Sequence, residues 1–476
     1  QTIDVIKTRA ECFGFELVIG DIADAELSEL FGAIFQYPAV TGEVRDLTDI
    51  ISQLHEHKAI AVVAADLMSL TLLKPPGEMG ADVVTGTTQR FGVPMGYGGP
   101  HAAYFATKED YKRALPGRII GVSVDKRERQ AFRMALQTRE QHIRREKANS
   151  NICTAQVLLA NISALYAMYH GPKGLKNIAQ RIHRLTSIMA AGLNTAGIEI
   201  VNENFFDTLT LKVAADDLSA ILDRAKASNI NLRIDRAEQD KSIGISLDEC
   251  SSSKDVKNIW QVILGDASHK ISAADIDALI VSGEKAAVIP NNLIRRSEYL
   301  QHPNFNNYHS ETEMMRYLKK LEDKDISLTH SMIALGSCTM KLNAAAEMAP
   351  ISWPEFANPH PFTPVEQMAG YQKMITGLEK MLEVITGFDA VSMQPNSGAQ
   401  GEYAGLLAIK KYLVSIGESD RNICLIPSSA HGTNPASAQM IGMKVVLVAC
   451  DDNGNIDVED LRRKAEANTD NLAALM

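Results

Sequence analysis

The chain has 476 residues, a formal net charge of −10, 45% hydrophobic residues and 22% charged residues. This is the composition of a soluble globular protein with several domains, and the acidic balance argues against nucleic acid or an anionic membrane as a partner. No apolar run approaches the ~18 residues that span a bilayer. The six cysteines are scattered without CxxC spacing, which argues against a structural zinc site.

The first ~120 residues alternate short apolar runs with helical patterns, which predicts a doubly wound α/β sheet. A crossover helix is predicted at residues 47–57, and a Gly- and Pro-rich loop at residues 92–100. The predicted strands are residues 16–19, 33–36, 60–65, 82–85 and 102–106.

Residues from ~130 to ~200 are predicted to be helical, with a buried helix at 154–169 and an amphipathic one at 174–196. A mixture of strands and helices follows, which predicts a small α+β domain. Its strands are predicted at residues 209–213 and 243–247, and its helices at 216–227 and 254–264. A polar connector leads to a second α/β unit that begins near Ser327.

The most informative segment is residues 398–405 (GAQGEYAG), read together with residues 428–435 (SSAHGTNP). A strand predicted at 390–393 precedes the first segment, and the predicted helix at 402–412 follows it. Exposed N–H groups and the positive dipole end of such a helix start can seat a phosphate. His431 follows a second predicted strand, at 422–426. An imidazole in this position can lie flat on a planar cofactor. A phosphate seat followed by a stacking imidazole suits a pyridoxal 5′-phosphate (PLP) site. Each feature alone is more typical of an ordinary turn or surface histidine.

Longer motifs run through both parts of the chain. They are YHSETEM at 308–314, GSCTMKLN at 336–343, WPEF at 353–356, HGTNPAS at 431–437, RFGVPMGYGGPH at 90–101 and LQTREQHIRR at 136–145. By these motifs the chain resembles the glycine dehydrogenase (decarboxylating) family, the PLP-dependent P-proteins of the glycine cleavage system. The resemblance extends over essentially the whole chain.

The resemblance implies an aspartate-aminotransferase-like α/β fold (PLP fold type I), with a doubly wound sheet in each of two tandem related halves. Both halves are expected to be incomplete here, with a small α+β domain between them, as in an internal piece of a protein about twice as long. The expected parts are the C-terminal part of the first-half large domain (1–125), a helical segment with the small domain (126–270), a connector (271–326) and the N-terminal part of the PLP-binding second half (327–476).

In enzymes of this fold a strand-end Asp holds the pyridine nitrogen protonated, and a later Lys forms the Schiff base. In the first half Asp66 follows the predicted strand 60–65, but Gln89 stands where the lysine would be, and an amide cannot form an imine. We therefore expect a structural role for this half, with Asp66 as a turn or capping residue. In the second half the lysine and the aspartate are expected beyond Met476. Lys341, which precedes the phosphate loop, is predicted to be an ordinary loop lysine.

The resemblance implies decarboxylation of glycine on PLP and transfer of the aminomethyl group to the lipoyl arm of H-protein. His431 is the candidate catalytic residue, as a ring-stacking imidazole that assists proton transfer. The candidate cofactor-binding residues are Ser397, Gly398, Ala399, Gln400, His431, Thr433 and Asn434. Candidates for the glycine carboxylate or the lipoyl channel are Tyr308, His309, Ser337, Cys338 and Thr339. No metal is expected, and the fragment alone is expected to be inactive because it lacks the Schiff-base lysine.

The implied partners are glycine, lipoylated H-protein and a second copy in a homodimer of the full-length form, in the bacterial cytoplasm or the mitochondrial matrix. One alternative is another fold-type-I PLP enzyme, either an amino-acid decarboxylase or a hydroxymethyltransferase. The motifs at 308–314 and 336–343 argue against it. A second alternative is a non-catalytic scaffold, because the chain carries no lysine in the Schiff-base position.

Overall fold

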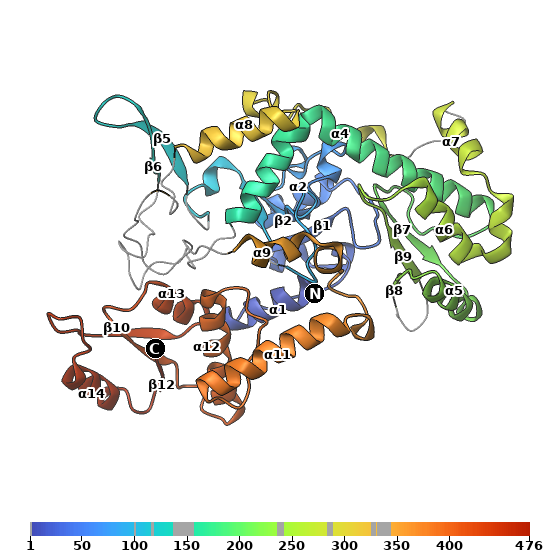
Figure 1. Cartoon of the computed structure of the whole chain (residues 1–476). Coiled ribbons are helices and arrows are strands. Elements are labelled where there is room, and N and C mark those ends of the chain that lie inside the picture. Colours follow the sequence, from blue (N-terminus) through green and yellow to red (C-terminus); the bar gives the residue numbers. More distant parts are fainter. Residues whose placement is uncertain are drawn as a thin grey trace. The chain divides into compact units, whose positions relative to one another are not determined.

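The computed structural model describes residues 2–99, 101–115, 119–136, 157–235, 242–282, 289–324, 330 and 344–476. The chain divides into two compact units, coloured by sequence in Figure 1. Unit 1 contains Gln1–Ala25, Glu109–Ala155 and Pro364–Met476, and unit 2 contains Glu26–Lys108 and Gln156–Thr363. The domain boundaries expected from the sequence stay a prediction. Among the described residues, no helix has both the length and the apolar character needed to cross a membrane.

The large sheet of unit 2 has the strand order β1-β2-β3-β4. Its first three strands are parallel, and β4 is antiparallel to β3. The helix α2 (Thr48–Glu56) crosses from β1 to β2 and buries Ile51 and Leu54. The strands are β1 (Gly32–Tyr37), β2 (Ile60–Ala65), β3 (Val83–Thr87) and β4 (Ala103–Thr107). The predicted α/β pattern of this region is therefore confirmed.

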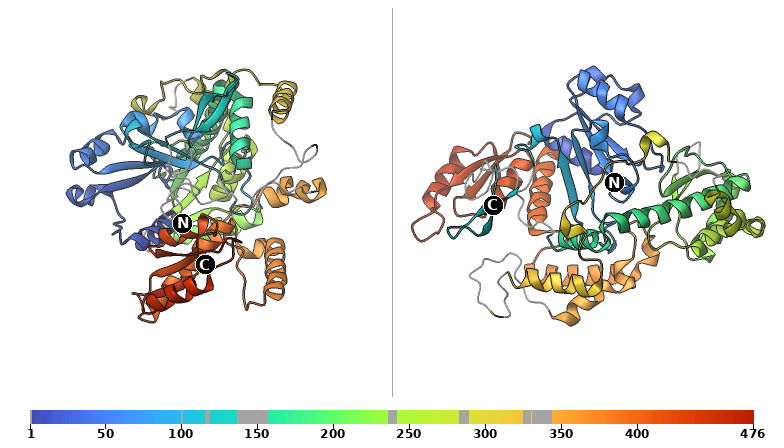
Figure 2. Two further views of the ribbon diagram at one scale, coloured as in Figure 1. Left: turned by 90° about the vertical axis from the view of Figure 1, so that its left-hand side faces the viewer. Right: turned by 90° about the horizontal axis from the view of Figure 1, so that it is seen from above.

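The long helix α4 (Val157–Thr195) contains a break at Gly171, where φ is 61° and ψ is 179°. From residue 157 onward, the two helices predicted at 154–169 and 174–196 are thus two segments of one bent element. The described part of the first segment is not buried as predicted, since Val157 and Leu158 are 59% and 61% exposed. Figure 2 shows α4 running from the large sheet to the small sheet of unit 2. Its second segment packs against α6 (Ser253–Leu264), where Trp260 Nε1 donates to the Met189 carbonyl at 3.1 Å.

The small sheet of unit 2 is antiparallel, with the order β7-β9-β8. A single hydrophobic core includes side chains of both sheets, such as Val63 and Leu209, which are fully buried. The strands are β7 (Thr208–Lys212), β8 (Arg233–Asp235) and β9 (Ser242–Ser246), which confirms the predicted α+β pattern. The remaining α-helices described in unit 2 are α5 (Ala215–Ala227), α7 (Ala273–Val281), α8 (Glu311–Glu322), α9 (Ala345–Met348) and α10 (Pro354–Ala357).

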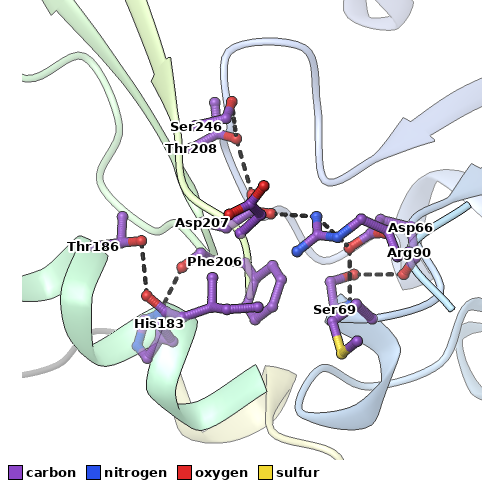
Figure 3. Close-up of polar contacts among 12 residues, drawn as sticks. Asp66, Ser69, Arg90, His183, Thr186, Phe206, Asp207, Thr208 and Ser246 are labelled. Atoms are coloured by element: carbon purple, nitrogen blue, oxygen red, sulfur yellow. Dashed lines mark hydrogen bonds and ion pairs between the residues drawn. The ribbon is translucent and has the colours of Figure 1, made fainter. Parts of the chain in front are cut away.

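A partly buried ion pair connects these two sheets (Figure 3). The Arg90 guanidinium lies 2.6 Å from Asp207, just before β7, and 3.6 Å from Asp66, just after β2. Asp66 also accepts the Ser69 N–H at 2.9 Å, so the prediction of a turn-capping residue is confirmed. Burial raises the pKa of Asp66. Burial by itself lowers the pKa of Arg90, but the two nearby carboxylates together raise this pKa by more than burial lowers it. The guanidinium therefore stays charged.

Unit 1 contains a parallel sheet with the order β11-β10-β12. Its strands are β10 (Ile423–Pro427), β11 (Lys444–Val448) and β12 (Leu472–Leu475), linked by α13 (Thr433–Met440) and α14 (Val458–Ala467). The strand predicted at 422–426 and the helix predicted at 402–412 are confirmed, the latter as part of α12 (Gly398–Ser415). The other elements described in unit 1 are α1 (Thr2–Phe13), α11 (Ala369–Thr386) and the hairpin of β5 (Ile120–Val124) with β6 (Gln130–Met134).

Three predictions of secondary structure are wrong. Residues 16–19 and 390–393 are irregular, and Val18 and Met393 leave 67% and 41% of their surface exposed. Each run is short and apolar, but within the described part of the chain no strand pairs with it to complete its hydrogen bonds, which a strand requires. Residues 130–134, expected to start a helix, pair instead with β5. The turn of this hairpin is fixed by Asp125, which accepts the N–H groups of Arg127 and Arg129.

Replacing Gly171 with alanine should destabilise unit 2 by about 2–4 kcal/mol, because this φ/ψ combination is strained for any residue with a side chain. A Cβ would also lie 2.7 Å from the Phe305 carbonyl oxygen and 2.6 Å from the His309 ring. Urea unfolding measures the loss. The control is Gly197→Ala, where φ is also positive but no atom lies within 4 Å of the added Cβ. Equal losses in the two variants would show that the contacts at Gly171 contribute nothing.

Replacing Arg90 with methionine should lower the unfolding free energy by roughly 3–5 kcal/mol, because two carboxylates lose a cation that is mostly shielded from solvent. The loss should be smaller near pH 5 than near pH 7. Asp66 then takes up a proton in the folded state, whereas the unfolded carboxyl group stays ionised in this window. The control is Arg184→Met, which removes a half-exposed pair with Asp277 and should cost under about 1 kcal/mol. A pH-independent loss would contradict this account.

Candidate cofactor site

The residues predicted to seat a phosphate lie at the start of α12. Ser397 is the N-cap residue, and its Oγ accepts the Gln400 N–H at 3.2 Å. The N–H groups of Gly398 and Ala399 have no acceptor within the helix, as at every helix start. A Cβ added at Gly398 would meet no atom within 4 Å, so the space beside this turn is open. The helix continues for 18 residues, so its dipole favours an anion at this end.

The loop after β10 carries His431 at the carboxyl end of the parallel sheet, where ligands of α/β sheets commonly bind. His431 is exposed, whereas Thr433, which begins α13, is 3% exposed. The His431 Nδ1 lies 2.8 Å from the Thr433 hydroxyl and 3.2 Å from the Thr433 backbone nitrogen. The Asn434 N–H donates to the His431 carbonyl at 3.0 Å. The short loop therefore holds the imidazole against the start of α13.

Glu402 joins the two segments, although it is not among the site residues predicted from the sequence. The Thr433 hydroxyl donates to Glu402 Oε1 at 3.1 Å, and the Ser437 hydroxyl donates to Oε2 at 3.3 Å. Glu402 lies on α12 five residues after Ser397, which is about 7.5 Å along the helix axis. The helix start and the imidazole loop are thus attached to the same end of α12. The sequence offered one indication of Glu402, which is that it is the only charged residue among the small and neutral residues at the start of this helix.

These residues fit the phosphate and ring of PLP, because they combine N–H donors, a hydroxyl, a helix dipole and an imidazole beside open space. The two lysines of α12 are engaged elsewhere. Lys410 Nζ donates to the Ile441 carbonyl, and Lys411 pairs with Glu11 at 2.8 Å. The assignment of Ser397, Gly398, Ala399, Gln400, His431, Thr433 and Asn434 to the cofactor stays a prediction.

A cysteine lies beside the same loop. The Cys450 thiol donates to the Ser429 hydroxyl at 3.2 Å, and hydrogen bonds with Ser428 and Ser429 lower the pKa of Cys450. In contrast, burial raises the pKa of Cys424 in β10 to about 11. Because the thiolate is the nucleophilic form, Cys450 has the more reactive environment of these two.

The predicted substrate residues lie elsewhere in the chain. Tyr308 stacks on Tyr317 with ring centroids 4.1 Å apart, and His309 Nδ1 donates to the Tyr169 carbonyl at 2.8 Å, both within unit 2. Ser337, Cys338 and Thr339 lie outside the described residues, as does Lys341. A substrate role for these residues stays a prediction.

Comparison with known proteins gives a consistent result over the whole chain. Two curated relatives, from Shewanella halifaxensis and Stutzerimonas stutzeri, are both called glycine dehydrogenase (decarboxylating). They are 61% and 63% identical over 100% of this chain and 49% of their own length. The chain therefore spans about half the length of the curated relatives it matches.

Solved structures with a similar fold include a glycine decarboxylase (P-protein) of the glycine cleavage system in inhibitor-bound form, with 30% identity and a TM-score of 0.48. That alignment covers 55% of this chain and 62% of the other. The family model described as "Glycine cleavage system P-protein" matches residues 1–263, which is more than half of the chain. The chain belongs to the glycine cleavage system P-protein family.

Proposed function

We propose that this chain is part of a PLP-dependent enzyme that decarboxylates glycine and transfers the aminomethyl group to the lipoyl arm of H-protein. The observation that supports this most strongly is the junction of the α12 start with the His431 loop through Glu402. The names of the curated relatives, which describe a decarboxylating glycine dehydrogenase, support the same substrate.

In this proposal the start of α12 binds the phosphate. The Ser397 hydroxyl and the N–H groups of Gly398, Ala399 and Gln400 supply the donors, and the helix dipole adds to them. When bound, PLP supplies an electron sink for the charge left at the glycine α-carbon as CO2 departs. His431 would face the pyridine ring and assist proton transfer, while Thr433 and Asn434 fix the loop that carries it.

The remaining assignments concern substrate and partners. Tyr308, His309 and the segment 337–339 bind the glycine carboxylate or border the path of the lipoyl arm. A pocket for this carboxylate favours reaction only if it binds the transition state better than the substrate. Glycine, lipoylated H-protein and a second copy of the full-length protein are the proposed partners, in the cytoplasm or the mitochondrial matrix.

In the full-length protein, replacing His431 with alanine should reduce the rate of glycine–bicarbonate exchange by at least about 100-fold, because an acid–base and stacking group is lost. The variant should also retain less PLP after gel filtration. Exchange is measured with labelled bicarbonate in the presence and absence of lipoylated H-protein. His57→Ala serves as the control, since this exposed histidine caps α2 in unit 2.

Two outcomes would contradict the proposal. Exchange that does not respond to H-protein would favour another PLP decarboxylase. Unchanged PLP content and turnover in His431→Ala would remove this histidine from the site.

A further inference from the structure

Three polar side chains behind His431 form a connected path. His431 Nδ1 contacts the Thr433 hydroxyl at 2.8 Å, and this hydroxyl contacts Glu402 Oε1 at 3.1 Å. The path is shielded, because Thr433 is 3% exposed and Ser437, on the other oxygen of Glu402, is fully buried. Among the described residues, the hydrogen bonds of the His431 ring all involve Nδ1.

The number of protons on these side chains limits which of them can donate in each hydrogen bond. A carboxylate can only accept hydrogen bonds, and a threonine hydroxyl has one proton to donate. When the Thr433 proton points at Glu402, only the lone pairs of the hydroxyl face Nδ1. A hydrogen bond at 2.8 Å then requires the proton to be on Nδ1.

The contact with the Thr433 backbone favours the other tautomer, in which Nδ1 carries no proton. The Thr433 backbone N–H points at Nδ1 from 3.2 Å, which is the long end of hydrogen-bond distances. If the hydroxyl proton were also turned toward Nδ1, both groups of Thr433 would donate to an unprotonated Nδ1. The ring proton would then be on Nε2. The local geometry therefore permits two tautomers, and the orientation of one hydroxyl decides between them.

We infer that Glu402 is a positioning residue that, through the Thr433 hydroxyl, keeps the proton of neutral His431 on Nδ1 and leaves Nε2 as the basic nitrogen. The catalytic consequence of this inference rests on the proposed function. The tautomer itself does not, because it depends only on contacts within the protein. An imidazole with a free Nε2 can accept a proton, whereas the other tautomer can only donate one from that atom. Glu402 thereby determines what the exposed nitrogen of His431 can do.

The tautomer is measurable without cofactor or substrate. The test uses the full-length protein, PLP-free, with ¹⁵N-labelled histidine, at an alkaline pH where imidazole is neutral. Solid-state NMR distinguishes protonated from unprotonated ring nitrogens, and the His431 signals are assigned by their loss in His431→Gln. We expect protonated Nδ1 and unprotonated Nε2 in the wild type. A wild-type protein with the proton on Nε2 would overturn the inference.

Two substitutions should move the proton to Nε2. Glu402→Met removes both acceptors, so the Thr433 hydroxyl turns to Nδ1. Thr433→Val removes the hydroxyl, which leaves only the backbone N–H to donate to Nδ1. The second variant keeps the test valid if the first does not fold. Unchanged ring signals in a folded variant of either kind would overturn the inference.

Two matched variants should keep the wild-type tautomer. Thr433→Ser retains the hydroxyl, and Ser437→Ala removes the other partner of Glu402 without interrupting the path to His431. A shift of the proton to Nε2 in Thr433→Ser would overturn the inference, because the path is then intact but ineffective.

The catalytic meaning is tested separately in the PLP-loaded full-length enzyme. Thr433→Val should lower kcat for glycine–bicarbonate exchange by roughly 100-fold, the lower end of an acid–base contribution, with a much smaller change in KM for glycine. Thr433→Ser should restore most of the rate. If the wild type shows no exchange, the proposed function fails while the NMR result still decides the tautomer. If exchange is normal in Thr433→Val although the tautomer has switched, Glu402 has no positioning role in the reaction.

Discussion

The junction between α12 and α13 is the contact on which the candidate site depends. Glu402 accepts hydroxyl protons from Thr433 and Ser437, both of which are buried. A buried hydroxyl without an acceptor is costly, so these two bonds constrain how the start of α13 lies against α12. The helix start at Ser397 and the imidazole of His431 are separate features in the sequence. We propose that they belong to one site, because Glu402, on the helix that starts after Ser397, accepts hydrogen bonds from the helix that follows His431.

The sheet of unit 1 supplies the other constraint. All three of its strands are parallel, so the loop that follows β10 emerges at the carboxyl edge of the sheet. The side chains beneath this edge, including Cys424 and Ile426, are fully buried and fix the strand end. A short loop on such a rigid base can hold an exposed histidine in a defined place.

In unit 2 the end of strand β2 carries a polar contact of another kind. Asp66 follows β2, but Arg90 stands beside it with Asp207. The carboxyl group is thus committed to a turn and to an ion pair that joins two sheets. The residue before Arg90 is Gln89, which cannot form an imine. The end of β2 therefore holds a partly buried ion pair, and we expect its part to be structural.

Four features follow from the order of the amino acids alone: the family, the strand β2 over residues 60–65, the small α+β domain and the turn at Asp66. These features rest on long motifs, local periodicity or a side chain that bonds its own turn. Prediction failed at residues 16–19 and 390–393 because an apolar run becomes a strand only if another strand pairs with it. It failed at residues 130–134 because pairing with β5 makes a strand of a segment expected to be helical. Glu402 was missed for the same physical reason. Its partners lie 31 and 35 residues away, and only the packing of α13 on α12 decides which buried hydroxyls a carboxylate will meet.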